Sequence, residues 1–394
     1  MAQISLNPSQ ASNLAKDIYA LTELPSIELA TSFLNKKHGN LFEFSDNKLL
    51  KGKTGGPGFI KCRTGFGYCL EGKHQLQGHA FILFRGTQYL ADWLTNLNVL
   101  VSKSSYNQSV HDGFNSAFKS MKPKLTQFTS TFSSKKIHTV HCIGHSLGGA
   151  VATLCGEWLK ASQNIKPFIY TFGSPRVGLQ GFSSICTTSI GSDRIFRAYH
   201  KTDIVPYIPI WPYVHTPDSG TEYFLPSPGV IPGGEFHSMT KYISSVSNAS
   251  WSSLSALKPE KKTDAGIAQW LKQKGPVGVT ISALDWLNSA IFFVIKKCVA
   301  SAQWLMAKAM GTSATIMDRI AYILSQGVNL EENISSWVVY LIGKIMSFLG
   351  YARTVSQKEL NRQFIQSVFT QLQQKLNTIA QNALSQTLVQ GRAI

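Results

Sequence analysis

The sequence predicts an α/β fold in which helices flank a mostly parallel sheet, followed by an all-helical C-terminal region. Short β-rich runs alternate with helical stretches up to about residue 250, a pattern typical of parallel sheets covered by helices. From about Gly266 onward, strand signals and proline nearly vanish. Because 394 residues allow two or three domains, we expect an α/β domain over 1–250, a polar, serine-rich linker over 251–264 and a helical region over 265–394.

Local patterns locate the main elements of the α/β part. The strand candidates are runs rich in β-branched and aromatic residues at 78–84, 137–143, 168–172 and 194–199. The helix candidates have apolar residues at helical spacing and cover 113–132 and 147–162. Glycine and proline crowd 206–234, so we expect an irregular excursion there.

Four helical stretches are expected in the C-terminal region, at about 280–310, 313–325, 332–352 and 356–389. In the third stretch, apolar residues from Ile334 to Leu349 recur at helical spacing and form one continuous face. Such faces pack on one another in a bundle or lie in a membrane interface, and both interpretations stay open. A membrane-spanning helix needs roughly 20 mainly apolar residues, and Lys344 interrupts the best candidate.

The composition is that of a globular protein with a basic surface. Hydrophobic residues make up 43% and charged residues 15% of the chain, which excludes collagen-like, disordered and coiled-coil classes. The formal net charge of +17 favours an anionic partner. We expect peripheral contact with an anionic membrane and no nucleic acid, because zinc-finger, RNP-like and helix-turn-helix signatures are missing. The oligomeric state stays open.

The N-terminus and the cysteines bear on the compartment. MAQISLNPSQ has no basic stretch followed by an apolar run, so we expect no Sec signal and a cytoplasmic or membrane-associated location, with non-Sec delivery as the alternative. The six cysteines form no CxxC pair and no metal-ligand spacing, which favours reduced, packed thiols. A Cys62–Cys69 bridge is the alternative in an oxidising setting.

The strongest chemical signal is the run VHCIGHSLGGAVATL at 140–154, in which a β-rich stretch enters GHSLG and a helical pattern leaves it. This is the strand, GxSxG, helix context of a nucleophile elbow. Gly144 and Gly148 are required because a larger side chain would collide in so tight a turn. Ser146 then stands at a helix N-terminus, where free N–H groups, including that of Leu147, favour developing negative charge.

A nucleophilic serine needs an imidazole base, and that imidazole needs a carboxylate on its other nitrogen. After a nucleophile elbow the chain order is serine, acid, histidine. Asp203 is the strongest acid candidate, because it closely follows a strand candidate and lies on a proline-bounded loop. Two histidines follow it, His215 and His237, and the order alone leaves both open. Thr87, immediately after another strand candidate, would add a second N–H donor for an oxyanion.

The run around Ser146 resembles the elbow of class 3 lipases, the fungal triacylglycerol-lipase-like branch of the α/β hydrolases. Further stretches are similar to motifs of that family and follow its order: FRGT at 84–87, VHDGF at 110–114, FGSPRVG at 172–178, TDIVPYIP at 202–209 and HSMTKY at 237–242. The resemblance implies an α/β-hydrolase domain over 1–250. It also implies that Asp203 orients the base, that His237 is the base, and that Thr87 and Leu147 form the oxyanion hole.

The same resemblance implies a lid and an activity. The family carries a short helical lid, which would fall at 88–97 with Trp93 and Leu94 covering the site; an ordinary helix with Trp93 in the core is the alternative. The implied activity is hydrolysis of lipid carboxylic esters through an acyl-enzyme, without metal or cofactor. The basic charge favours phospholipase A or lysophospholipase activity. The alternatives are a triacylglycerol lipase and a membrane-binding scaffold with a vestigial hydrolase fold.

Overall fold

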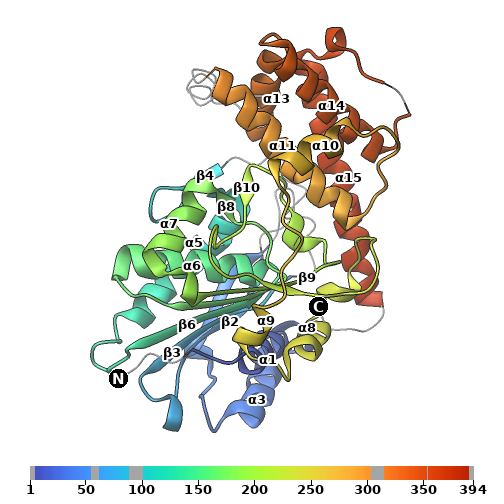
Figure 1. The fold of residues 1–394 in the computed structure, drawn as a ribbon. Helices are drawn as coiled ribbons and strands as arrows, with labels where there is room; N and C mark the ends of the chain where they lie inside the picture. The colour runs from blue at the N-terminus through green and yellow to red at the C-terminus, as the bar shows by residue number, and fades with distance from the viewer. Residues whose placement is uncertain (1–4, 55–61, 88–100, 303–314, 353, 390–394) are drawn as a thin grey trace.

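The computed structural model describes residues 5–54, 62–87, 101–302, 315–352 and 354–389. At its centre lies a seven-stranded sheet in the order β1-β2-β3-β6-β7-β9-β11, with helices on both faces (Figure 1). The strands from β3 to β11 are parallel, and β2 and β1 add antiparallel at one edge. In sheet order they span Leu49–Thr54, Cys62–Glu71, His79–Phe84, Thr139–His145, Phe168–Phe172, Ile195–His200 and Tyr223–Leu225. The predicted α/β fold is confirmed.

A second, smaller sheet has the order β10-β8-β5-β4. In that order its strands span Tyr213–Val214, Gly178–Leu179, Ser109–His111 and Val101–Lys103. The predicted irregular excursion at 206–234 contains the short strands β10 and β11, and the chain around them is otherwise irregular.

Two layers of helices cover the main sheet (Figure 1). One layer holds α1 (Pro8–Asp17), α3 (Ile27–His38), α8 (Met239–Val246) and α9 (Trp251–Leu254), with the short α2 (Ala20–Glu23) beside them. The other holds α5 (Asp112–Thr129), α6 (Leu147–Gln163) and α7 (Gln180–Ile190). Each layer buries its own apolar cluster, with Ile18 and Met239 in the first and Met121 and Leu154 in the second. Because both faces are covered, the central strands are buried throughout and their sequences are nearly continuous apolar runs.

The predicted strands and helices match observed elements within a few residues. The four strand candidates are β3, β6, β7 and β9, and the two helix candidates are α5 and α6. The helices and strands before residue 72 were not predicted. In that segment β1 and β2 are rich in glycine, lysine and threonine, so their apolar alternation is weak. Their strand character comes from the pairing of β1 with β2 and of β2 with β3.

The C-terminal region is a helical bundle, which confirms the all-helical prediction. Its helices are α10 (Asp264–Lys272), α11 (Ile281–Ser301), α13 (Ile316–Gly327), α14 (Glu332–Leu349) and α15 (Arg362–Val389). The apolar face predicted for the third stretch is buried: Val338, Leu341 and Ile345 on α14 are each 0% exposed. This face therefore packs inside the bundle. Within the described ranges, no helix is both long and apolar enough to cross a membrane.

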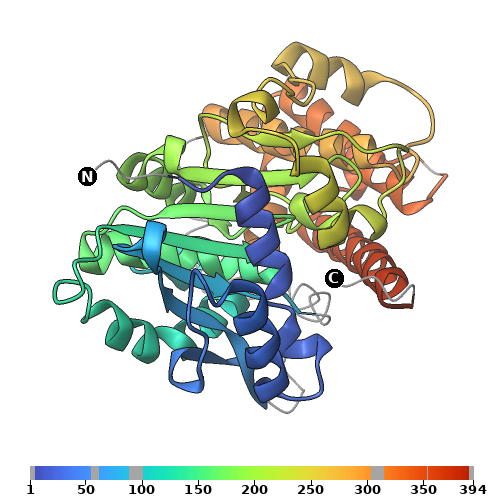
Figure 2. The same cartoon turned by 90° about the horizontal axis from the view of Figure 1, so that it is seen from below.

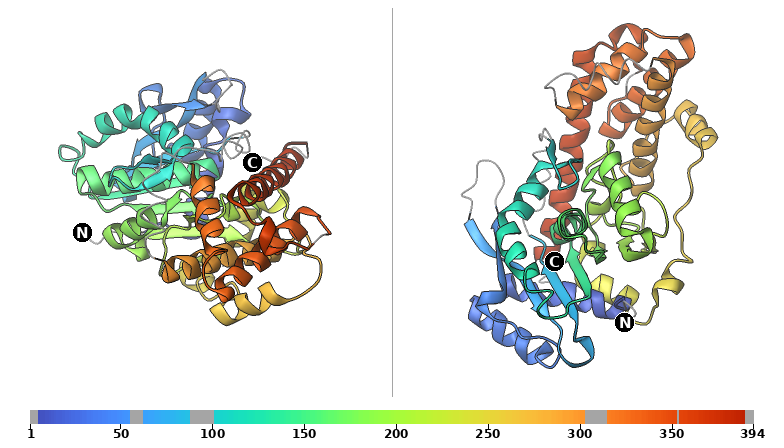
Figure 3. Two further views of the ribbon diagram at one scale, coloured as in Figure 1. Left: turned by 90° about the horizontal axis from the view of Figure 1, so that it is seen from above. Right: turned by 90° about the vertical axis from the view of Figure 1, so that its left-hand side faces the viewer.

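The long helix α15 runs from the bundle back to the α/β part (Figures 1 and 3). Near its end it contacts the turn η5 (Glu235–His237), where the Cβ of an alanine at Gly234 would lie only 1.6 Å from the Ala383 carbonyl oxygen. Viewed from below, α15 projects beside the sheet domain (Figure 2). The predicted end of the α/β domain at residue 250 stays a prediction. Just after this position, the Trp251 indole N–H donates to the Leu6 carbonyl at 2.7 Å, so this residue still contacts the N-terminal segment.

Candidate active site

A sharp bend places Ser146 between β6 and α6. Its backbone has φ 57° and ψ −129°, an unfavourable conformation for a residue with a side chain. Both flanking glycines are necessary: a Cβ at Gly144 would lie 2.1 Å from the Gly148 carbonyl oxygen, and one at Gly148 would lie 2.3 Å from that of Phe84. The Ser146 N–H donates to the Phe172 carbonyl at 3.0 Å, which ties the bend to β7. The strand, bend, helix context inferred from the sequence is therefore present.

The structure brings the three predicted triad residues together. His237 Nδ1 lies 2.8 Å from Asp203 Oδ2, and His237 Nε2 lies 2.9 Å from Ser146 Oγ. Because the carboxylate accepts, Nδ1 carries the proton, and Nε2 is the acceptor for the serine hydroxyl. All three residues are fully buried. The chain thus forms a hydrogen-bonded Ser–His–Asp array with the geometry that base-assisted attack by serine requires.

The Asp203 carboxylate is held by more than the imidazole. The Tyr242 hydroxyl donates to Oδ2 at 2.7 Å, and the Val205 N–H donates to Oδ1 at 2.9 Å. Gly173, with φ +56°, makes room for these groups, since a Cβ there would lie 2.7 Å from Asp203 Oδ2. Tyr242 was not singled out from the sequence, although it closes the HSMTKY motif. Burial beside Asp203 raises the pKa of the Tyr242 hydroxyl well above its usual value, so it stays a donor.

A second chain of hydrogen bonds supports the other side of His237. The Gly86 N–H donates to the Tyr19 hydroxyl at 3.0 Å, and Tyr19 in turn lies 2.7 Å from His145 Nδ1. His145 Nε2 donates to the His237 carbonyl at 2.7 Å. Burial, and then the nearby His237, lower the pKa of His145 well below its usual value, which keeps this ring neutral. Tyr19 belongs to the unpredicted N-terminal segment, and no local motif could have identified it.

The two predicted oxyanion donors belong to segments that adjoin Ser146. Leu147 is the first residue of α6, so its N–H has no acceptor within the helix. Thr87 is 3% exposed and follows Gly86, whose own Cβ position lies 3.0 Å from the Ser146 Cβ. Arg85 fixes this segment by donating from Nε to the Gly65 carbonyl at 2.6 Å and from Nη1 to that of Gly86 at 2.7 Å. The structure therefore places Leu147 directly after the serine, and Gly86, the neighbour of Thr87, against the Ser146 Cβ.

The predicted lid residues, Trp93 and Leu94, lie outside the described residues. Their covering role stays a prediction. What the structure does give is complete burial of Ser146 and His237.

The alternative base, His215, lies elsewhere. Its Nε2 is 3.4 Å from Nε of the buried Arg176, and its ring stacks near Tyr199 with the centroids 6.2 Å apart. Burial, followed by the charges of Arg197 and Arg176, lowers the pKa of His215 well below its usual value. Because the neutral His215 ring is held by Arg176, its role is structural. His237, and not His215, is the hydrogen-bond partner of Ser146.

The cysteines described by the structure are buried, free thiols, namely Cys69, Cys142, Cys155, Cys186 and Cys298. This agrees with the prediction of reduced, packed cysteines. The Cys69 side chain forms no bridge in the structure, and burial raises the pKa of its thiol, so it behaves as an apolar core residue.

Comparison with known proteins gives matches to lipases. Residues 81–213 match the family model described as lipase (class 3). A lipase of Caenorhabditis elegans is 32% identical over 170 residues, covering 40% of this chain and 46% of that protein. The secreted mono- and diacylglycerol lipase 1 of Fusarium solani is 33% identical over 147 residues, covering 36% of this chain and 42% of that protein. The chain thus spans less than half the length of these relatives.

A lipase structure from Rhizopus microsporus var. chinensis is 24% identical, with a TM-score of 0.43, and the match covers 55% of this chain and 72% of that one. The segment that matches the family model includes Thr87, Asp203 and the bend at Ser146, whereas His237 lies beyond its end. The resemblance expected from the short motifs is confirmed: residues 81–213 match the class 3 lipase family model.

Proposed function

We propose that this protein hydrolyses carboxylic esters of lipids through an acyl-enzyme on Ser146. The observation that carries the proposal is the unbroken hydrogen-bond chain from Ser146 Oγ through His237 to Asp203. The match of residues 81–213 to class 3 lipases supports it.

The proposed reaction has two halves. Ser146 Oγ attacks the ester carbonyl while His237 Nε2 accepts the hydroxyl proton, and Asp203 stabilises the imidazolium that forms. The backbone N–H groups of Leu147 and Thr87 stabilise the oxyanion, a contribution of roughly 10² to 10³ in rate for one such donor. His237 then protonates the departing alkoxide. In the second half a water attacks the acyl-enzyme with His237 again as the base, which releases a fatty acid and restores the serine.

Acylglycerols are the first substrate class to test. One matched relative is named a mono- and diacylglycerol lipase. Phospholipase A or lysophospholipase activity is the second candidate, and the net charge of +17 favours it, because a basic surface concentrates a protein on anionic phospholipid. The same surface charge is the basis for proposing peripheral contact with anionic membranes.

The experiment compares the full-length protein with Ser146→Ala and with Ser130→Ala, an exposed serine at the end of α5. Each is assayed on a short-chain p-nitrophenyl ester, on emulsified mono-, di- and triacylglycerols, and on neutral and anionic phospholipid vesicles. We expect Ser146→Ala to lower kcat on the order of 10⁶-fold, while Ser130→Ala has no effect.

The outcomes separate the candidates. Release of fatty acid from acylglycerols alone identifies an acylglycerol lipase, and release from phospholipid identifies a phospholipase. Equal activity of the wild type and Ser146→Ala on every substrate would refute the proposed nucleophile. Vesicle binding without any hydrolysis would instead support the membrane-binding scaffold.

A further inference from the structure

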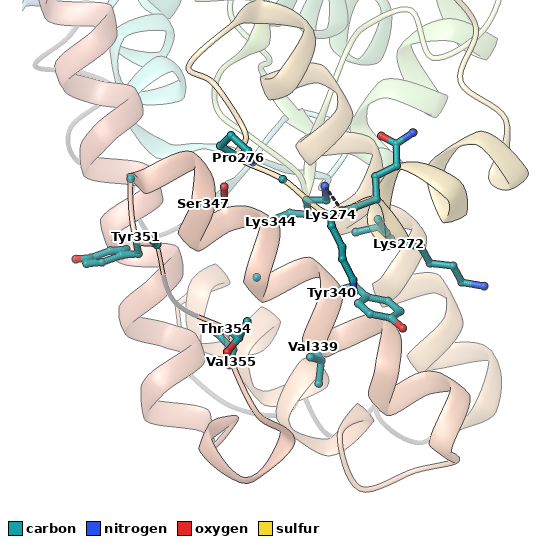
Figure 4. A pocket seen from close by; sticks show the side chains of 16 residues that line it. Lys272, Lys274, Pro276, Val339, Tyr340, Lys344, Ser347, Tyr351, Thr354 and Val355 are labelled. Carbon is teal, nitrogen blue, oxygen red and sulfur yellow. Dashed lines mark hydrogen bonds between the residues drawn. The ribbon is translucent and has the colours of Figure 1, made fainter.

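A groove in the helical bundle lies outside the proposed active site. It has a volume of about 690 Å³, within the range of small-molecule sites in proteins. Sixteen of the described residues line it, contributed by the end of α10, the loop that follows it, one side of α14 and the chain just after α14 (Figure 4). The serine esterase reaction described above uses none of these residues.

The groove is basic at one end. Three lysines, Lys272, Lys274 and Lys344, are among its lining residues, and the described lining contains no aspartate or glutamate. The Lys272 ammonium lies 5.1 Å from the centroid of the Trp337 ring. Within the described parts of the chain, none of the three lysines pairs with a carboxylate. Three lysines without an ion-pair partner among the described residues make this end of the groove attractive to a negatively charged group.

Lys344 differs from an ordinary surface lysine. Its side chain is only 8% exposed, and its Nζ lies 4.9 Å from the centroid of the Trp270 ring. The ammonium donates to the Gln273 carbonyl at 2.8 Å, and among the described residues this is the one hydrogen-bond acceptor for its three N–H groups. Burial lowers the pKa of Lys344. An anion in the groove would supply the missing acceptor and offset the cost of burying this charge.

The other end of the groove is apolar. Figure 4 shows Val339, Thr354 and Val355 on the side away from the lysines, with Tyr340 between the two ends. Gly343, which also lines the groove, lies in the interior of α14, where glycine is less favourable than alanine. A Cβ at this position would meet nothing within 4 Å. No close packing requires a glycine here, and its absent side chain leaves open space beside the helix.

We propose that this groove binds a free fatty acid as its carboxylate anion. The carboxylate lies at the Lys272, Lys274 and Lys344 end, and the acyl chain follows the apolar wall past Gly343. A single-chain lipid fits better than a bilayer surface, because the Lys344 ammonium is recessed and a flat membrane would meet only the exposed Lys272 and Lys274. The proposal depends on the groove alone and stands whether or not Ser146 hydrolyses esters.

Binding is tested with the full-length protein by isothermal titration calorimetry, using decanoate, decanol and acetate. Decanoate tests the complete ligand, decanol the chain without charge, and acetate the charge without chain. We expect decanoate to bind and the other two to bind at least about tenfold more weakly, since a hydrogen bond to a charged group is worth more than one to a neutral group. Decanol that binds as tightly as decanoate would overturn the proposed carboxylate site.

Two variants locate the binding. Lys344→Met keeps most of the side-chain stem and removes the charge, and we expect it to weaken decanoate binding about tenfold. Gly343→Leu fills the floor of the groove, and we expect it to abolish measurable binding. Because leucine is a better helix former than glycine, this variant should unfold at the same temperature as the wild type or a higher one. Lys375→Gln, an exposed lysine of α15 outside the groove, is the control and should bind normally.

Decanoate binding that neither Lys344→Met nor Gly343→Leu changes would place the ligand elsewhere, the esterase site included, and refute the proposal. The last arm measures binding to phosphatidylcholine vesicles with and without phosphatidylglycerol. If the two variants weaken vesicle binding while the wild type does not bind decanoate, the groove is a membrane-docking surface and the fatty-acid assignment is wrong.

Discussion

The Tyr242 hydroxyl and His237 Nδ1 share one acceptor, Asp203 Oδ2, at 2.7 and 2.8 Å. The same tyrosine oxygen accepts the His200 N–H at 3.2 Å, so Tyr242 links β9 to the carboxylate that accepts from His237. The position of this carboxylate therefore depends on α8 as well as on its own loop. Tyr242 is a positioning residue, because it acts on the serine only through Asp203 and His237.

Tyr242→Phe tests this role. Loss of a buried hydrogen bond to a charged group should lower the free energy of unfolding by about 1.5–3 kcal/mol. We also expect kcat for a soluble ester to fall about tenfold with KM unchanged, because Asp203, with one donor fewer, orients the imidazole less well. The measurements are urea unfolding and steady-state kinetics, with Tyr351→Phe as an exposed control. A loss of stability with an unchanged kcat would show that Tyr242 is purely structural.

Asn288 on α11 connects the bundle to the α/β part. Its Oδ1 accepts from Arg176 Nη1 at 2.8 Å and from the Trp211 N–H at 2.7 Å. Arg176 is 4% exposed, and burial lowers its pKa to about 10. Without the Asn288 side chain, the buried Arg176 guanidinium and the Trp211 N–H each lose this hydrogen-bond acceptor.

Asn288→Ala should therefore lower the free energy of unfolding by about 2–3 kcal/mol. The exposed Asn329→Ala in the same bundle should change it by less than about 0.5 kcal/mol. Urea denaturation followed by fluorescence measures both. If the two variants are equally stable, the bundle and the α/β part are not coupled through Asn288.

His200 makes stability depend on pH. Burial lowers its pKa from 6.5 to about 4, while Nδ1 lies 2.7 Å from the Phe236 carbonyl and Nε2 lies 2.9 Å from Ser245 Oγ. Between pH 6.5 and 4 the unfolded chain takes up a proton that the native ring does not, so stability falls as the pH falls, by up to roughly 3 kcal/mol.

The unfolded His200→Asn chain has no imidazole at this position to take up the proton. The loss of stability between pH 6.5 and 4 should therefore be smaller than in the wild type by up to roughly 3 kcal/mol. We expect the variant to be less stable than the wild type at neutral pH. The exposed His74→Asn should keep the wild-type pH dependence. Free energies of unfolding measured at half-unit pH intervals decide the point. Parallel curves for the wild type and His200→Asn would exclude His200 as a source of acid sensitivity.

Two adjacent glycines give a matched test of how α15 sits on the η5 turn. A Cβ at Gly234 would lie 1.6 Å from the Ala383 carbonyl oxygen, whereas a Cβ at Gly233 would meet nothing within 4 Å. Gly234→Ala should therefore push the end of α15 away and lower the free energy of unfolding by about 1–3 kcal/mol. Gly233→Ala should be nearly neutral.

Amide hydrogen exchange reports the displacement directly. We expect faster exchange in residues 376–384 for Gly234→Ala and unchanged exchange for Gly233→Ala. Equal exchange in both variants would mean that α15 does not depend on this contact. The ester hydrolysis rate of the same pair shows whether the helix position affects the turn that carries His237.

The sequence by itself determined the local chemistry of this protein. Neighbouring residues in the sequence determine the Ser146 bend, because the backbones of Gly144 and Gly148 lie too close to the Gly148 and Phe84 carbonyls to allow any side chain. The central strands and α14 were predictable for a similar reason: burial on one or both sides imposes an apolar pattern that local sequence reveals. The order of serine, acid and histidine likewise reduced the base to two candidates.

Tertiary structure decided which distant groups meet. From residue types alone His215 and His237 were equivalent, and only the folded chain gives one to Arg176 and the other to Ser146. Tyr19, more than a hundred residues from His145, reaches it only because α1 packs on the sheet. Hydrogen bonds between side chains far apart in the chain leave no period and no spacing in the sequence, so no local pattern could have predicted them.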